Sequence, residues 1–245
     1  MSAQAKPGAV KRFWDRATLA EKAGGWAVML DARPMRIPGG AFLLLTSRAL
    51  AEAVAAEWQA AGGAKDGTLT MNEVPLTRLA GTAQDRIAPD PAPVAAELAR
   101  YAESDLLCYR AEHPQPLVVR QAQAWQPWLD WMERTHGVRL EPTEGILHRK
   151  QDPAALARVH AIMQERTPAA LAGLGIAVPA LGSAVLGLAL ADGALDAAEA
   201  HRLATLDEMF TVDGWGEDAD AKVRRDHVGA DLLVVERFMQ LSALP

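Results

Sequence analysis

Closely spaced carboxylates near the end of the chain are the residues with the clearest capacity for chemistry. They lie within residues 207–220, before the next basic residue: Asp207, Glu208, Asp213, Glu217, Asp218 and Asp220. Adjacent acids of this kind can serve as general acid and base in glycoside hydrolysis, or they can bind a hard cation. One hypothesis is therefore a carboxylate-based hydrolase or a cation-dependent enzyme that uses these acids.

Other features of the sequence weaken the enzyme hypothesis. Residues 207–220 lack the alternating acids, central glycine and closing glutamate of a calcium-binding loop. The six histidines are scattered rather than paired as in metal sites, and no phosphate-binding glycine pattern occurs. Cys108 lies among apolar and aromatic residues and is predicted to be a small buried side chain. We therefore expect no catalytic residues, no metal site and no cofactor.

Trp215 gives the same acidic segment a second interpretation, which concerns binding. This tryptophan stands between Gly214 and Gly216, just before a predicted helix. The acids could simply cap and solvate that helix, because the helix N-terminus is partly positive. Alternatively, they could form an acidic surface with an aromatic anchor that recognises arginines of a partner protein. A purely structural role and a partner-binding role both remain open on the residues alone.

Composition limits the class of partner. The chain has 245 residues, a formal net charge of −6 and one cysteine. From Asp192 to the end there are twelve acidic and five basic residues, which argues against nucleic acid as the main partner.

A single cysteine excludes an internal disulfide and favours a reducing compartment. Residues 1–14 lack the apolar segment of a secretory signal, so we expect a cytoplasmic protein.

The first part of the chain has the pattern of an antiparallel sheet covered by a helix. Short β-prone runs between residues 13 and 45 are separated by Gly24-Gly25 and by Pro38-Gly39-Gly40, as in a meander. Ser47 can cap a following helix that ends near residue 62. One face of that helix is predicted to pack on the sheet: Leu50, Ala51, Val54, Ala55 and Trp58.

Beyond a proline-dense stretch at residues 88–93, the strong patterns are helical. Helices are predicted over residues 91–102, 116–135, 153–166, 168–178, 180–191, 196–210 and 217–241. Residues 168–191 carry no charge, but their alanine and glycine content favours two buried helices over a membrane span. The predicted fold class is therefore α+β, with an N-terminal antiparallel β-rich domain and its covering helix (1–88) followed by an all-helical C-terminal domain (89–245).

The last predicted helix has an apolar repeat that defines its expected buried face. The residues of that face are Val223, Ala230, Val234, Phe238 and Leu241. His227 falls on the same face and is predicted to be a core histidine with a hydrogen-bond partner.

Eight segments, spread nearly from end to end, together form a distinctive series. They are KRFW (11–14), GWAVMLDARPMRIPGG (25–40), SRALAEAVAAEWQA (47–60), PLTRLAGTAQD (75–85), YAESDLLCYRAE (101–112), RQAQAWQPWLDW (120–131), LGSAVLGLALADG (181–193) and DEMFTVDGWGED (207–218). In this order the segments resemble the assembly chaperones that bind the unassembled alpha subunit of the F-type ATP synthase catalytic head. Residues 209–211 are less polar than is usual in that family.

The resemblance implies a two-domain α+β chaperone that is not an enzyme and uses no cofactor. Its partner would be the alpha subunit, held until the beta subunit takes over the interface, with no nucleic acid and no membrane insertion. The implied partner-binding residues are Glu217, Asp218 and Asp220, supported by Asp207, Glu208 and the anchor Trp215. The resemblance also implies a bacterial cytoplasmic protein, monomeric when free, with mitochondrial relatives in eukaryotes.

Overall fold

The computed structural model describes residues 10–37, 40–145 and 147–245. Pro38 and Gly39 of the predicted turn, and residues 1–9 of the N-terminal segment, lie outside these ranges. The chain divides into two compact units. One unit contains the chain up to Pro89 together with Phe238–Pro245, and the other contains Asp90–Arg237.

The first unit is built on a small antiparallel sheet, as the sequence predicted. Its strands are β2 (Ala17–Lys22), β3 (Gly25–Leu30), β4 (Arg33–Pro34) and β5 (Leu44–Leu45). Strand β3 is central: it pairs with β2 along its whole length and with β4 and β5 at opposite ends. Gly25 is required where β5 crosses, because a Cβ there would lie 2.4 Å from the carbonyl oxygen of Leu45.

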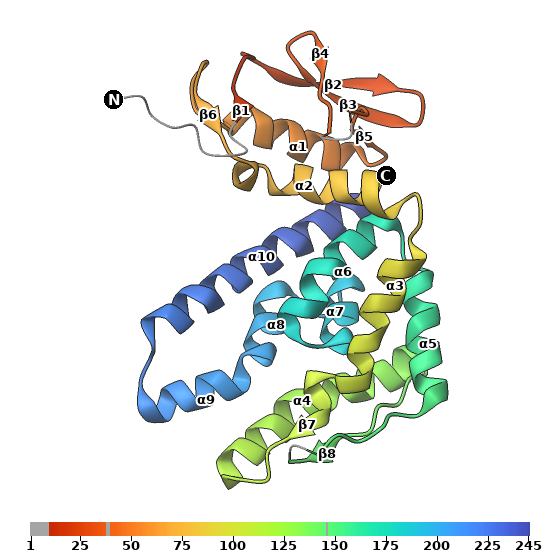
Figure 1. The fold of residues 1–245 in the computed structure, drawn as a ribbon, viewed down its shortest axis with the longest axis vertical. Helices are drawn as coiled ribbons and strands as arrows, with labels where there is room; N and C mark the ends of the chain where they lie inside the picture. The colour runs from red at the N-terminus through yellow and green to blue at the C-terminus, as the bar shows by residue number, and fades with distance from the viewer. Residues whose placement is uncertain (1–9, 38–39, 146) are drawn as a thin grey trace. The chain divides into compact units, whose positions relative to one another are not determined.

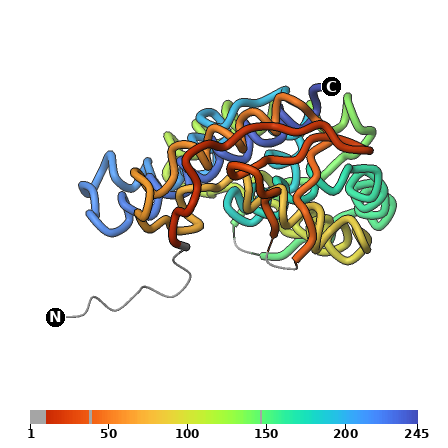
Figure 2. The backbone as a smooth tube through the Cα atoms, turned by 90° about the horizontal axis from the view of Figure 1, so that it is seen from above, coloured from red at the N-terminus to blue at the C-terminus, as the bar shows by residue number. Residues whose placement is uncertain are grey.

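Helix α1 (Arg48–Ala60) covers this sheet. Its buried residues are the predicted ones: Leu50, Ala51, Val54, Ala55 and Trp58. The Trp14 indole N–H donates to the carbonyl of Trp58, and the Trp58 indole N–H donates to the hydroxyl of Thr77 on α2 (Pro75–Thr82). The β2–β3 hairpin lies along α1 in both backbone views (Figure 1 and Figure 2).

Short elements complete the first unit. They are β1 (Val10–Lys11), which pairs antiparallel with β6 (Thr68–Leu69), the 3-10 turn η1 (Met71–Glu73), the π turn η2 (Ala83–Ile87) and the end of α10 (Ala219–Ala243). The Ser47 hydroxyl accepts a hydrogen bond from the Leu50 amide, as an N-cap should, and also donates to the carbonyl of Leu241 at 2.6 Å. Ser47 therefore both caps α1 and hydrogen-bonds to the last turn of α10.

The second unit is helical, which confirms the predicted fold class. Its elements are α3 (Ala92–Ala99), η3 (Arg100–Ser104), η4 (Leu106–Cys108), α4 (Gln115–His136), α5 (Pro153–Gln164), α6 (Pro168–Leu181), α7 (Ala184–Ala191), α8 (Ala197–Ala204), α9 (Leu206–Trp215) and most of α10. A short parallel pair, β7 (Tyr109–Arg110) with β8 (Thr143–Glu144), accompanies them and was not predicted.

Three helix boundaries differ from the prediction. The helix expected from residue 91 begins at Ala92, because Pro91 occupies the N-cap of α3, where it makes no side-chain cap bond. The break between α6 and α7 falls at Gly182 and Ser183 rather than at Pro179, because Gly182 adopts the left-handed conformation that ends a helix and Ser183 caps the next one. The single helix expected over residues 196–210 is two helices that break at Thr205.

Helices α6 and α7 are the two buried helices expected from the uncharged stretch. Their approach is close, since a Cβ on Gly187 would lie 2.5 Å from a methyl carbon of Val178. Within the described ranges, no helix is both long and apolar enough to cross a membrane.

Asp105 is a fully buried carboxylate that joins two helix starts in this core. Its oxygens accept hydrogen bonds from the amides of Leu107 and Val185 and from the hydroxyl of Ser183, at 3.1, 3.1 and 2.7 Å. Burial raises the pKa of Asp105 to about 6, although these hydrogen bonds oppose the rise. Nearby Cys108 is buried as predicted, and desolvation raises its thiol pKa to about 12, which makes it a poor nucleophile.

Candidate partner-binding surface

Helices α9 and α10 form a hairpin that carries all six acids of residues 207–220. Helix α9 ends at Trp215 because Gly216 has φ of +90°, a conformation that favours glycine. Asp218 then accepts a hydrogen bond from the Ala221 amide at 2.8 Å and so caps the first turn of α10. This geometry places Trp215 at the turn of the hairpin, with 90% of the side chain exposed.

A buried arginine joins the two helices of the hairpin. The guanidinium of Arg225 on α10 donates to Glu208 on α9 at 2.6 Å and to Glu217 in the connection at 2.5 Å. Its side chain is only 8% exposed, and the hydrogen bond to Glu208 raises the pKa of Arg225. We refer to Arg225, Glu208 and Glu217 as the Arg225 latch.

The remaining acids have different environments. Asp207 accepts a hydrogen bond from the Gln121 side chain at 2.8 Å, and Asp213 pairs with Arg120 at 2.9 Å, so both face α4. Asp220 lies exposed in the first turn of α10 and has no hydrogen bond or ion pair within the part of the chain that the structure describes. Of the six acids, Asp220 is therefore the one whose charge is most available to a partner.

Trp215 also borders an apolar groove of about 430 Å³ between α4 and α9. The groove is lined by Pro114, Leu117, Arg120, Phe210, Thr211, Asp213, Gly214 and Trp215. The Arg120 guanidinium lies 5.2 Å from the centroid of the Phe210 ring and is also paired with Asp213, so the groove wall is braced by a cation–π contact and an ion pair. An exposed indole beside such a groove is a typical anchor for protein recognition.

The arrangement of the acids does not match that of a two-carboxylate hydrolase. Asp207 and Glu208 diverge, one toward Gln121 and the other toward Arg225. Glu217 and Asp218 also diverge, since one joins the latch and the other caps α10. Neither adjacent pair presents two carboxyl groups to one bond, as glycoside hydrolysis requires. Among the described residues there is also no cluster of three or more histidine, cysteine or acidic side chains suited to a metal.

The acids and Trp215 are apparent as candidates from the sequence, whereas the residues that position them are not. The expected buried face of the last helix is wrong in its first half: Val223 is 53% exposed and His227 is also exposed, whereas Arg225 is buried. In the first half of α10, from residue 219 to residue 231, the buried side chain is that of Arg225 and not an apolar one. No local signal could identify Arg225, because its pairing depends on a turn between two helices.

The family model for the ATP12 chaperone protein matches residues 11–133, half of the chain. The chain belongs to the ATP12 chaperone family. Its fold superposes on the crystal structure of Atp12 from Paracoccus denitrificans with a TM-score of 0.90 and 39% identity, covering 95% of this chain and 98% of that one. A solved structure of a protein from Agrobacterium tumefaciens superposes with a TM-score of 0.86 and 38% sequence identity. That match covers 95% of this chain and 86% of the other.

A fungal relative extends the ATP12 assignment. The mitochondrial protein atp12 of Schizosaccharomyces pombe is 23% identical over 222 residues, which cover 86% of this chain and 75% of the fungal one. The matches to complete folds include the helical part beyond residue 133, so the ATP12 resemblance extends to the α9–α10 hairpin. The family predicted from the eight sequence segments is thereby confirmed.

Proposed function

We propose that this chain is an assembly chaperone that binds the unassembled alpha subunit of the F-type ATP synthase catalytic head and shields its interface until the beta subunit replaces it. Membership of the ATP12 family supports this function. A subunit of an obligate complex exposes a large apolar interface when it is alone, and that surface favours aggregation or wrong pairing. The chaperone would act as a stoichiometric binder in the bacterial cytoplasm, monomeric when free and without turnover or cofactor.

The single observation that carries the proposed binding surface is the exposure of Trp215 beside an apolar groove. The indole would insert into the alpha subunit's interface, and the exposed carboxylates of Asp220 and Asp218 would pair with arginines at its edge. Glu208 and Glu217 would contribute chiefly by holding α9 against α10 through Arg225. Asp207 would support the surface from the α4 side.

Capture of the purified alpha subunit tests this assignment. Trp215→Ala is expected to weaken capture by roughly tenfold or more, because a central aromatic anchor commonly contributes over about 1.4 kcal/mol. Asp220→Lys is expected to weaken capture several-fold at low salt and less at high salt, because exposed charges are screened. Titration calorimetry measures the affinity of each variant and of the unaltered chain for the alpha subunit. Thermal unfolding of the same preparations checks that each variant is folded.

The matched control for the charge reversal is Glu97→Lys. Glu97 is an exposed acid of α3 in the same unit, so the change in net charge is identical. Equal losses for Glu97→Lys and Asp220→Lys would show that capture depends on overall charge and not on the α9–α10 hairpin. Undiminished capture by Trp215→Ala would remove Trp215 from the binding surface.

A further inference from the structure

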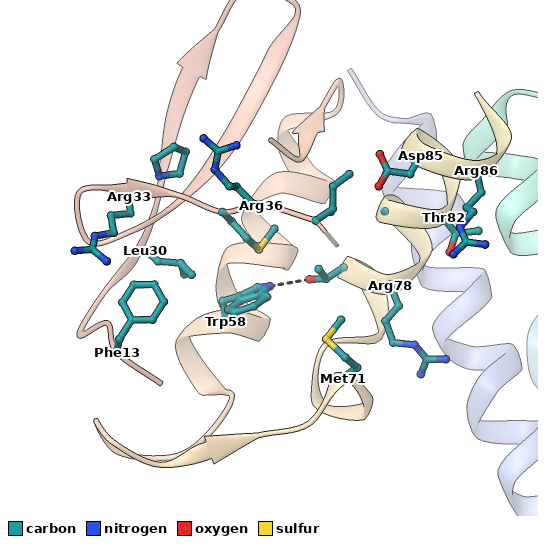
Figure 3. Close-up of a pocket in the computed structure, with 15 residues that line it drawn as sticks. Phe13, Leu30, Arg33, Arg36, Trp58, Met71, Arg78, Thr82, Asp85 and Arg86 are labelled. Atoms are coloured by element: carbon teal, nitrogen blue, oxygen red, sulfur yellow. Dashed lines mark hydrogen bonds between the residues drawn. The ribbon is translucent and has the colours of Figure 1, made fainter. Parts of the chain in front are cut away.

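The first unit contains an open pocket of about 1280 Å³ that the proposed surface on α9 and α10 does not use. Its walls come from the end of β3, the β4 region, α1, η1, α2 and η2, all within that unit. Figure 3 shows Trp58 between the strand side, with Phe13 and Arg33, and the α2 side, with Arg78. The pocket is thus assembled from segments far apart in the sequence.

The floor of this pocket is apolar. It is formed by Phe13, Leu30, Met35, Ile37, Trp58 and Met71. The only polar atom of the Trp58 side chain already donates to Thr77 at 2.9 Å, so the indole presents carbon atoms to the pocket. Phe13 is 47% exposed, which is high for a phenylalanine next to a core. A floor of this kind favours a bulky apolar side chain from a ligand.

The rim of the pocket is basic, in contrast to the net charge of −6 of the whole chain. It carries four exposed arginines, Arg33, Arg36, Arg78 and Arg86, and one acid, Asp85. None of the four arginines forms an ion pair with a carboxylate in residues 10–37, 40–145 or 147–245, whereas several arginines elsewhere do.

Aromatic rings and neutral groups contact three of these arginines instead. The guanidinium of Arg33 lies 5.7 Å from the Phe13 ring centroid, and that of Arg36 lies 4.2 Å from the Phe42 ring centroid. Arg36 also donates to the carbonyl oxygen of Gly40, and Arg78 donates to the Asn72 side chain at 3.3 Å. The hydrogen-bonding capacity of these groups is therefore largely free for carboxylates, which arginine binds in bidentate geometry.

We propose that this pocket binds an acidic segment of a partner protein, with an apolar side chain on the floor and flanking carboxylates at the arginine rim. The proposal rests on the proposed function in identifying that partner as the client subunit. The client would then be held at two sites of opposite charge: an acidic hairpin that takes basic groups and a basic pocket that takes acidic ones. Two-site binding strengthens the hold without requiring either site to be tight.

The test uses fluorescein-labelled synthetic peptides and the full chain. A short peptide of glutamate flanking leucine is expected to bind, and binding is expected to weaken as salt rises. Arg33→Glu and Arg78→Glu are each expected to weaken peptide binding by roughly three- to tenfold. Arg16 is an exposed arginine of the same unit outside the pocket, so the control variant Arg16→Glu is expected to leave peptide binding unchanged. Thermal unfolding of each variant verifies folding, with Arg33→Gln and Arg78→Gln as milder substitutions.

Two comparison peptides decide whether both features of the pocket are used. The proposal would be overturned if a lysine–leucine peptide, or a glutamate–glycine peptide, bound as tightly as the glutamate–leucine peptide. Complete displacement of the glutamate–leucine peptide by inorganic phosphate would also overturn it, because that result would indicate a simple anion site. The same variants are then tested for capture of the alpha subunit. If the unaltered chain captures the alpha subunit but binds no peptide, the peptide-binding role of the pocket is refuted and the proposed function is not. If the unaltered chain fails to capture the alpha subunit, the proposed function is refuted, and the peptide titrations alone decide whether the pocket binds acidic segments.

Discussion

An Asp105→Ala variant is expected to lose about 4 kcal/mol of unfolding free energy, because three buried donors lose their acceptor at once. The amides of Leu107 and Val185 and the hydroxyl of Ser183 all donate to this carboxylate. An Asp105→Asn variant keeps one acceptor oxygen and is expected to lose about half as much. Urea denaturation at neutral pH measures both values, and a loss under about 1 kcal/mol for alanine would show that these donors find other partners.

The same carboxyl makes stability depend on pH in a stated direction. Its pKa is about 6 in the folded chain, against 3.8 for an ordinary aspartate, because burial disfavours the charge. Between these two values the folded chain retains a proton that the unfolded chain has released. The contribution of Asp105 to the unfolding free energy therefore falls by about 3 kcal/mol as pH rises from about 4 to about 6. The difference between the unaltered chain and Asp105→Asn should show this slope, and parallel curves would contradict it.

A Glu217→Lys variant is expected to lose alpha-subunit capture by more than about tenfold and also to unfold at a lower temperature. The new lysine would face the buried guanidinium of Arg225, which would then retain only Glu208. Repulsion between the two cations would separate α9 from α10 and displace Trp215. Both losses should appear together, because the latch positions the surface rather than forming it.

Asp220→Lys separates the two effects. It makes the same change in charge three residues further along the chain, at an acid without an ion pair among the described residues. Capture should weaken while the unfolding temperature stays nearly constant. Differential scanning calorimetry and a binding titration on both variants measure the contrast. If Glu217→Lys left the unfolding temperature unchanged, the Arg225 latch would have no structural role.

Local signals in the sequence predicted much of the fold. Ser47 caps the helix that it was expected to start, because its side chain bonds to the amide three residues further along. The face of α1 that contains Trp58 was likewise predictable from spacing alone.

Tertiary pairings were not predictable in this way. Arg225 is charged and lies in a helix rich in charged residues, so nothing in its neighbourhood predicts burial; its two partners lie 17 and 8 residues away. The basic pocket was also missed, because its arginines are spread from Arg33 to Arg86 and only the packing of α2 near β4 brings them together. The sequence singles out the candidate acids, but which of them stay free of intramolecular pairing depends on these tertiary contacts.

Order of addition with purified subunits tests the central claim most directly. The alpha subunit is kept alone, mixed with this chain, or mixed with this chain and then with the beta subunit, and each sample is followed by light scattering and size-exclusion chromatography. We predict that the chain suppresses aggregation of the alpha subunit in a stoichiometric complex, and that the beta subunit releases the chain as it pairs with alpha. A chain that leaves alpha aggregation unchanged, or that stays bound after the beta subunit has paired with alpha, would contradict the proposed function.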